Sequence, residues 1–331
     1  MAPKRTKHAG KQSSSSRHPR RQAEREAPAP RPWQRVSLNV MQPDPAFPNV
    51  PLRWLLRAFA LTLLFVIACA WLLLCFLFWQ GSWQLLYHPS RVVAATPSDR
   101  NLAFQWIHFD ASETGVTQLT AWWIPADTAI PRNAILVLHG ADGNLADTLP
   151  LDAWLHSMHQ NVFVLDYRGY GKSASGKPSE AQLAHDAMRA IRWLADTKHI
   201  PRNSVVVWGT GLGANIATQL AAHSSDIAGV VLEAPIDHPL DSILNDPRSH
   251  LVPARLLLRD HYDFTGDAAR LAVPSLWLLP QSSPRPPAYD RIATQKTVVW
   301  LQMPLENDPH SSEALTRWLD ALPAFAATPA R

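Results

Sequence analysis

The sequence of 331 residues predicts an α/β domain, a mostly parallel sheet with helices on both faces, that follows one membrane-spanning helix. Three observations lead to this prediction. An uncharged apolar stretch lies near the N-terminus, and short apolar runs alternate with helical patterns after it. In addition, 47% of the residues are hydrophobic, which is enough for a core in the about 250 residues that follow the apolar stretch.

The first segment, residues 1–52, is a basic, proline-rich tail that contains a run of serines. Residues 1–57 carry 12 Lys and Arg but only 3 Asp and Glu, out of 31 and 27 in the whole chain. Few aliphatic residues interrupt the tail, so it is predicted to be disordered and cytoplasmic. The rest of the chain has an acidic excess, which argues against a nucleic-acid partner for the globular part.

The second segment, residues 53–80, is predicted to be an uncleaved signal anchor. Its apolar stretch, Ala58–Trp79, contains no charge and is too long for the core of a cleaved signal peptide. Arg53 and Arg57 flank it on one side, and the next basic residue on the other side is Arg91. This asymmetry predicts a single-pass membrane protein with its N-terminus in the cytoplasm and its globular domain outside.

The positions of the cysteines indicate the cellular compartment of that domain. Cys69 and Cys75 both lie in the apolar stretch, so the exported part can form no disulfide. Domains of this size manage without disulfides in the bacterial periplasm more often than in eukaryotic secretion, which favours an inner-membrane protein with a periplasmic domain.

The third segment, residues 85–325, is predicted to be one α/β domain. Pro178–Thr197 and Ser312–Leu322 have helical patterns, and an insertion over Pro235–Asp267 is expected to cover strand ends like a lid. Short apolar runs of the kind found in buried strands occur at Phe104–Phe109, Leu119–Ile124, Ala134–Leu138, Val162–Leu165, Val205–Trp208, Gly229–Leu232, Ser275–Leu279 and Thr297–Leu301.

One strand-to-helix junction has the spacing of a nucleophile elbow. In "VWGTGLGANIA" the five positions of the G-x-S-x-G pattern run from Gly209 to Gly213, and Gly211 stands where the serine would be. The tip of such a turn has an unfavourable positive φ, and glycine removes both that strain and the nucleophile. The pattern therefore predicts a preserved turn that has lost its reactive atom.

Four motifs in this order resemble the α/β-hydrolase superfamily, in particular its membrane-anchored, esterase-like and peptidase-like abhydrolase branch. They are "LVLHGADGN", "FVLDYRGYGKSASG", "VWGTGLGANIA" and "LEAPID", and "LLYHPSR" and "LTAWWIPA" resemble the same branch. The resemblance covers about Leu85 to Leu322. It implies an α/β-hydrolase fold.

The resemblance also implies site residues. Backbone N–H groups of Gly140 or Ala141 and of Leu212 would form an oxyanion hole. The triad appears degenerate: Gly211 occupies the nucleophile position, and Ser283 occupies the position of the acid. His310, which follows the last strand and precedes the helix expected from Ser312, is a weak candidate for the histidine, and a surface role for it is open.

Other polar residues offer alternatives to the degenerate triad. Asp237 or Asp241 could replace the missing acid, as in hydrolases that place it after the preceding strand. Ser173 follows a strand without an elbow and is expected to be structural. His156 and His159 share a helical face, but no third ligand stands nearby, so no metal or other cofactor is expected.

Three functions fit these observations. The leading interpretation is a membrane-anchored pseudoenzyme that binds a small-molecule or protein ligand and contacts the membrane through residues 58–79. The second is an active esterase or peptidase with a relocated nucleophile. The third is a structural or interaction domain whose useful parts are its anchor and tail.

Overall fold

The computed structural model describes residues 50–127, 133–302, 305 and 308–322. The predicted disordered tail therefore lies almost entirely outside the described residues. The chain divides into two compact units, Met1–Phe59 and Ala60–Arg331, and everything below apart from the bounds of the first helix concerns the second unit.

Helix α1, Leu52–Gly81, contains no acidic residue and is rich in Leu, Phe and Ala. The apolar segment that contains it, Leu52–Leu85, has a mean hydropathy of 2.8 over its best window. A helix of 30 residues rises about 45 Å, more than the hydrocarbon core of a bilayer. By length and composition α1 can cross a membrane, which is consistent with single-pass anchoring. The short helix η1, Ser82–Leu85, follows it directly.

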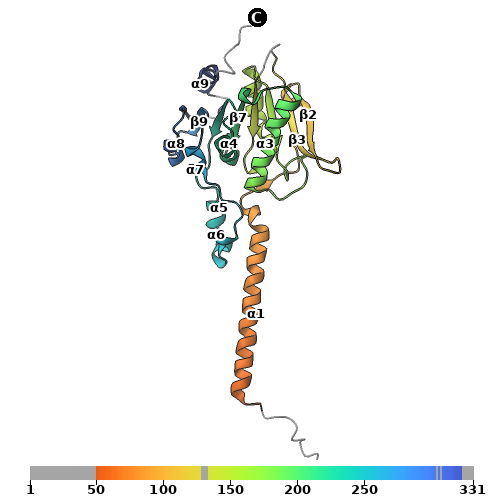
Figure 1. Ribbon diagram of the computed structural model, residues 1–331, viewed down its shortest axis with the longest axis vertical. Helices are drawn as coiled ribbons and strands as arrows, with labels where there is room; N and C mark the ends of the chain where they lie inside the picture. Colours follow the sequence, from red (N-terminus) through yellow and green to blue (C-terminus); the bar gives the residue numbers. More distant parts are fainter. Residues whose placement is uncertain (1–49, 128–132, 303–304, 306–307, 323–331) are drawn as a thin grey trace, which may run out of the picture. The chain divides into compact units, whose positions relative to one another are not determined.

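The domain is built on an eight-stranded sheet (Figure 1). The strands from β10 to β6 run parallel to one another, and β3 and β2 at the far edge are antiparallel to their neighbours. In spatial order the strands are β10 (Lys296–Leu301), β9 (Ser275–Pro280), β8 (Gly229–Glu233), β7 (Val205–Thr210), β4 (Ala134–Leu138), β6 (Val162–Asp166), β3 (Thr117–Ile124) and β2 (Gln105–Ala111).

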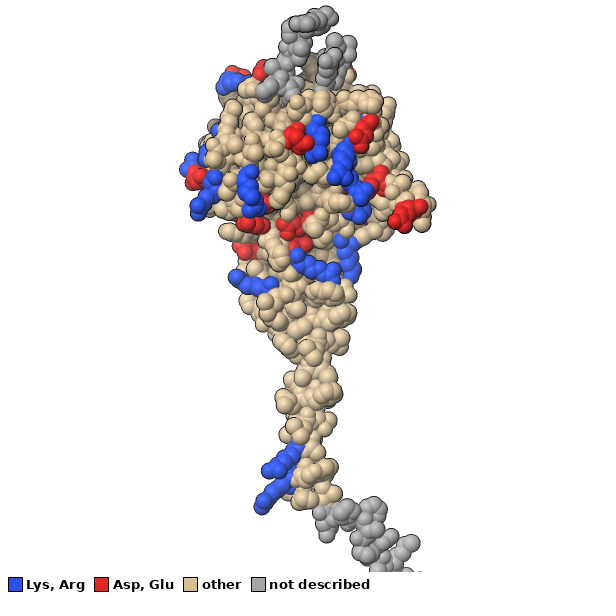
Figure 2. All heavy atoms as spheres, in the orientation of Figure 1, with Lys and Arg blue, Asp and Glu red and all other residues tan. Residues whose placement is uncertain are grey.

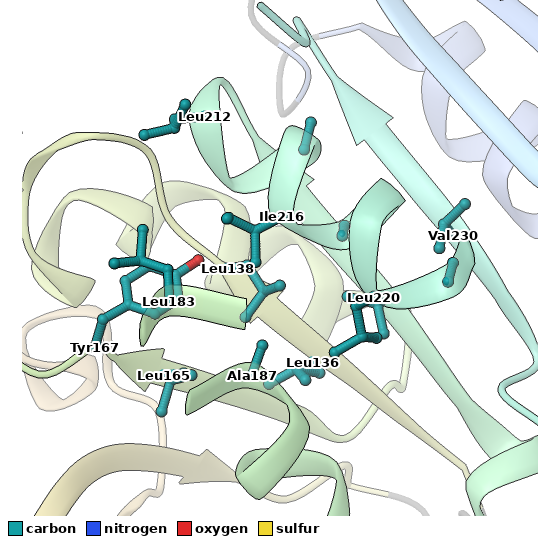
Figure 3. Close-up of a cluster of buried hydrophobic side chains, with 14 of the residues drawn as sticks. Leu136, Leu138, Leu165, Tyr167, Leu183, Ala187, Leu212, Ile216, Leu220 and Val230 are labelled. Atoms are coloured by element: carbon teal, nitrogen blue, oxygen red, sulfur yellow. The ribbon is translucent and has the colours of Figure 1, made fainter. Parts of the chain in front are cut away.

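Helices cover both faces of this sheet, and strand β4 shows why. All five of its side chains are completely buried, so both of its faces must be covered. Leu136 and Leu138 belong to one apolar cluster with α3 (Glu180–Thr197) and α4 (Leu212–Ala222), as Figure 3 shows. Ile135 and Val137 belong to a second cluster with α2 (Leu149–Ser157) and α9 (Pro309–Asp320).

A short two-stranded ladder links the end of α1 to the site edge of the sheet. Strand β1 (His88–Pro89) pairs in parallel with β5 (Asp142–Gly143), which begins four residues after β4 ends. The carboxyl edge of the parallel strands therefore lies on the side of the domain where α1 ends.

The predicted lid-like insertion lies on the same side. It contains α5 (Asp241–Leu244), η5 (Pro247–Leu251), α6 (Ala254–Leu257) and α7 (Phe264–Ala269). The Tyr87 hydroxyl, just after η1, forms hydrogen bonds of 2.6 Å with Asp260 and with the Tyr262 hydroxyl. The remaining short helices are η2 (Pro97–Arg100), η3 (Leu145–Thr148), η4 (Arg202–Ser204) and α8 (Pro287–Arg291).

The predicted fold class is confirmed, and one helix boundary was wrong. Each predicted strand is present with ends that differ by at most two residues. The last helix begins at Pro309 rather than at Ser312, because the Asp308 side chain accepts a hydrogen bond from the His310 N–H and caps the helix. His310 therefore lies inside the helix and not before it.

Candidate functional site

The turn between β7 and α4 has the backbone conformation of an elbow. Gly211 joins the strand to the helix with φ +57° and ψ −119°. A Cβ atom at this position would meet no atom within 4 Å. A side chain on residue 211 would therefore project into open space, and only the backbone strain of a positive φ opposes it.

The flanking glycines fix this turn by packing. A Cβ on Gly209 would collide with the Gly213 carbonyl, and a Cβ on Gly213 would collide with the carbonyl oxygens of Leu138 and His139 at the end of β4. The start of α4 thus packs directly against two strand ends. Leu212 is the first residue of α4, so its N–H has no acceptor within the helix.

The loop after β4 lies beside the elbow. A Cβ built on Gly140 would lie 3.5 Å from the carbonyl oxygen of Thr210, the residue before the tip. The neighbouring Ala141 carbonyl accepts hydrogen bonds from the Tyr170 hydroxyl at 2.8 Å and from the His88 N–H at 3.0 Å. The structure therefore brings Gly140 and the elbow together and holds the loop of Gly140 and Ala141 from two sides.

A buried histidine forms a hydrogen bond with this loop. The His139 Nδ1 donates to the Gly140 carbonyl at 2.9 Å, which leaves Nε2 facing the Asp166 carboxylate at 3.8 Å. Burial lowers the pKa of His139 to about 4. Burial also raises the pKa of Asp166 to about 6, although the N–H groups of Leu145 and Lys172 donate to it. At neutral pH the imidazole is therefore neutral and most of the carboxylate is ionised.

The two other triad positions lie beyond β9 and β10, one in the loop after β9 and one in the first turn of helix α9. Ser283 is exposed, and its N–H donates to the Pro280 carbonyl. His310 is exposed in the first turn of α9. Among the residues that the structure describes, no hydrogen bond joins the His310 ring to Ser283 or to the Gly211 turn.

The alternative acids lie elsewhere. Asp241, at the start of α5, lines a groove together with Ser249, His250 and Arg255. Asp237 follows β8, and its Oδ1 is buried without a hydrogen-bond partner in the described part of the chain. Neither carboxylate forms a hydrogen bond with His310 there.

An open groove of about 620 Å³ lies over the carboxyl ends of β8, β9 and β10. Its lining includes Glu233, Gln281, Ser282 and Gln302. The Glu233 carboxylate accepts hydrogen bonds of 3.0 Å from the Thr210 hydroxyl and from the Trp208 indole. Because Thr210 directly precedes Gly211, these bonds connect the groove to the elbow. Sequence reasoning missed Glu233, although its position at the end of the strand in "LEAPID" could have indicated it.

The comparisons agree with this geometry. Residues 133–277 match the family described as alpha/beta hydrolase fold. Protein bem46 of Schizosaccharomyces pombe is 32% identical over 146 residues, which are 44% of this chain and about half, 48%, of that protein. An uncharacterized protein of Mycobacterium tuberculosis is 29% identical over 60% of this chain and 68% of its own length. A Pyrococcus furiosus esterase superposes with a TM-score of 0.57 at 19% identity, over 72% of this chain and 98% of the esterase.

The chain has the α/β-hydrolase fold, and these matches support its assignment to the α/β-hydrolase superfamily. The α/β-hydrolase fold accounts for the strand order, for the antiparallel β3 and for the elbow conformation of Gly211. Within this hydrolase fold the groove is lined by residues that end β8, β9 and β10 and by residues of the loops that follow β9 and β10. Ser282, Gln281 and Gln302 line it here.

Ser173 has a structural role in this hydrolase fold. Its side chain is buried, and its hydroxyl donates to the Asp166 carbonyl at 2.6 Å and accepts from the Thr120 N–H at 2.8 Å. Both hydrogen bonds join loop to sheet, which leaves the hydroxyl unable to reach a substrate. In the part of the chain that the structure describes, no cluster of three or more His, Cys, Asp or Glu could hold a metal ion.

Proposed function

We propose that this chain is a membrane-anchored α/β-hydrolase-like protein that lacks hydrolytic activity and binds a ligand or partner at the carboxyl edge of its sheet. The observation that carries this proposal is Gly211 at φ +57°, with open space where a nucleophile would project. The absence of a carboxylate at Ser283 and the exposed position of His310 support it.

The size of the missing contribution favours a loss of activity. Removing the serine of subtilisin lowers the rate by about 2 × 10⁶, or roughly 8 to 9 kcal/mol of transition-state stabilisation. An oxyanion hole and substrate binding alone leave only about 10³ to 10⁴ over the reaction in water. A chain that keeps the N–H groups of Gly140 and Leu212 but lacks a nucleophile is therefore expected to bind rather than to hydrolyse.

Serine-directed fluorophosphonate probes test the loss of activity on the full chain in detergent. We expect no covalent labelling of the parent, and little labelling of Gly211→Ser because no base activates the new hydroxyl. The double variant Gly211→Ser with Ser283→Asp is the matched test of a restored acid. Labelling of the parent that disappears when one serine, such as Ser282, is changed to alanine would replace this proposal with a relocated nucleophile.

The groove beside Glu233 is the proposed binding place. Among the described residues of its lining, the Glu233 carboxylate and the amides of Gln281 and Gln302 suit a ligand with hydrogen-bond donors, either neutral or cationic. Native mass spectrometry of the purified full chain is compared with a Gln302→Trp variant, in which the indole fills the groove. We expect a small molecule that co-purifies with the parent alone, and equal mass for both proteins after correction for the substitution would contradict binding in the groove.

The proposed topology places the N-terminus in the cytoplasm and the domain outside, in a bacterial inner membrane with the domain in the periplasm. It is supported by Arg53 and Arg57 on one side of the apolar stretch and by the lack of a basic residue before Arg91 on the other. A reporter that is active only outside the cytoplasm, fused after Arg331, should be active. An inactive reporter on a stable fusion would reverse the orientation.

A further inference from the structure

Part of the insertion between β8 and β9 lies against the C-terminal half of α1, within the unit Ala60–Arg331. The Trp71 indole donates a hydrogen bond of 3.2 Å to the Leu251 carbonyl, and the Arg259 guanidinium lies 3.8 Å from the centre of the Trp79 ring. Figure 1 shows α5 and α6 beside the upper part of α1. We call residues 247–257, which contain η5 and α6, the juxtamembrane segment.

The position of Trp71 sets the level of this segment along α1. Trp71 precedes Trp79, the end of the apolar stretch, by eight residues, which corresponds to about 12 Å of helix rise. Leu251 therefore lies beside the apolar part of α1 and not beside its polar end. If α1 spans a bilayer over Ala58–Trp79, this level is inside the hydrocarbon core.

The juxtamembrane segment exposes apolar side chains at this level. Leu251 is 61% exposed and Leu256 is 85% exposed. A mostly apolar groove of about 410 Å³ separates the segment from α1. Its apolar lining includes Leu74, Leu77 and Phe78 of α1 and Leu251 and Val252 of the segment, and its polar lining is Ser82, Gln84 and Arg248. The apolar surface of α1 thus continues onto the globular domain at Leu251 and Val252, and Figure 2 shows that most of α1 carries no charged side chain.

The polar groups of the segment are arranged for such surroundings. The Leu251 carbonyl and the Trp71 indole satisfy each other, and the Ser249 hydroxyl hydrogen-bonds to the carbonyls of Leu244 and Asp246. A bilayer tolerates irregular backbone only where such groups have internal partners. The Arg248 guanidinium forms two hydrogen bonds of 2.8 Å with the Asp246 carboxylate, which balances its charge. Arg255 is exposed, and its long side chain can extend to lipid phosphates.

We propose that the juxtamembrane segment is a second membrane contact of this chain. Leu251 and Leu256 enter the acyl-chain region of the leaflet on the domain's side, acyl chains fill the groove beside α1, and Arg255 binds a phosphate group of that leaflet. This inference rests on the membrane-spanning role of α1 proposed above.

Site-directed fluorescence on the full chain in vesicles tests the contact. In a background with Cys69→Ser and Cys75→Ala, single cysteines replace Leu256 in the segment, Leu64 in α1 and Val116 in the turn between β2 and β3. All three side chains are well exposed, so a nitrobenzoxadiazole label at each is compatible with folding. The vesicles contain equal parts of phosphatidylcholine and phosphatidylglycerol, and quenching by nitroxide-labelled acyl chains is compared with quenching by aqueous iodide.

We expect the label at residue 256 to behave like the label at residue 64. Nitroxide lipids should quench it roughly twofold or more relative to the label at residue 116, and iodide should quench it little, because an inserted side chain is shielded from water. Quenching at residue 256 by iodide alone would overturn the proposal. Protection from both quenchers would also overturn it, in favour of a protein interface. A label at residue 64 that responds only to iodide would overturn the anchor and this inference together.

Discussion

The elbow and the loops that follow β9 and β10 belong to the same site edge, yet they differ in what holds them. A Cβ on Gly209 would overlap the backbone of α4, and a Cβ on Gly213 would overlap the backbone at the end of β4, so there is no room at either for a single carbon atom. Ser283 is exposed in the loop after β9, and His310 is exposed in the first turn of α9. The tightly packed part keeps the form expected of a hydrolase, and in the exposed part a serine stands at residue 283, where the resemblance implies a carboxylate.

This difference means that the residues that stabilise the fold are not the residues that the chemistry would need. The turn at Gly211 follows from the packing of α4 on β4 and β7, so a change in it would disturb the core. A carboxylate at residue 283 would contribute to catalysis and hardly at all to stability, because the position is exposed. Loss of activity is therefore compatible with full retention of the fold, and substitutions in the two regions should have very different effects.

The largest effect is expected for Gly213→Ala. The added Cβ would overlap the carbonyl oxygens of Leu138 and His139, which are backbone atoms of a central strand end and cannot move independently. We expect a loss of about 3 kcal/mol or more in the free energy of unfolding, or no folded protein. The measurement is chemical denaturation of the full chain in detergent, followed by tryptophan fluorescence. Gly140→Ala, whose Cβ would make an ordinary contact, is the matched control and should retain most of the stability.

The second effect depends on pH and concerns the buried pair of His139 and Asp166. The pKa of Asp166 is about 6 in the folded chain, above its ordinary 3.8, so its contribution to stability grows as the pH falls from about 6 to about 4. His139 acts in the opposite direction, because its folded pKa of about 4 lies below its ordinary 6.5. Asp166→Asn removes the first contribution, so the variant should lose stability faster than the parent on acidification, with a difference of up to about 3 kcal/mol.

Denaturation curves at several pH values between neutral and pH 4 measure this difference. The exposed substitution Asp320→Asn is the control and should follow the parent at every pH. Parallel curves for Asp166→Asn and the parent would mean that burial does not shift the titration of Asp166.

A smaller effect is expected for Gly211→Ala. The new Cβ has no neighbour within 4 Å, so the cost is the backbone strain of a positive φ, about 1 to 2 kcal/mol. His310→Ala removes an exposed side chain and should change the free energy of unfolding by less than about 0.5 kcal/mol. Equal stabilities of the parent and Gly211→Ala would contradict the strained tip and would weaken the comparison between the two regions.

Most of the fold could be predicted because its elements depend on local patterns. The continuous apolar runs of β4, β6 and β7 have both faces buried, and the spacing of Leu183, Ala187, Ile191 and Leu194 gives α3 one apolar face. The elbow was predictable for the same reason, since its glycines mark close backbone contact in any sequence of this pattern. The conformation of Gly211 agrees with the turn that the motif indicated.

The parts that could not be predicted depend on contacts between distant residues. Glu233 receives its role from Trp208 and Thr210 on the neighbouring strand, and no local pattern shows that the groove beside it is open. The hydrogen bond between Trp71 and Leu251 joins residues 180 positions apart. The true start of α9 was missed because Asp308, the capping residue, was interpreted as part of a loop.

The short ladder between β1 and β5 limits the distance between the end of α1 and the site edge of the sheet. His88 follows the end of α1 by seven residues, and even a fully extended chain of that length would span no more than about 25 Å. For a chain whose α1 crosses a bilayer, the elbow is thus held on a short tether close to the membrane surface. Its encounters with a partner anchored in the same membrane become a search in two dimensions, with a raised effective concentration. A large soluble partner, by contrast, would have to approach through a narrow gap.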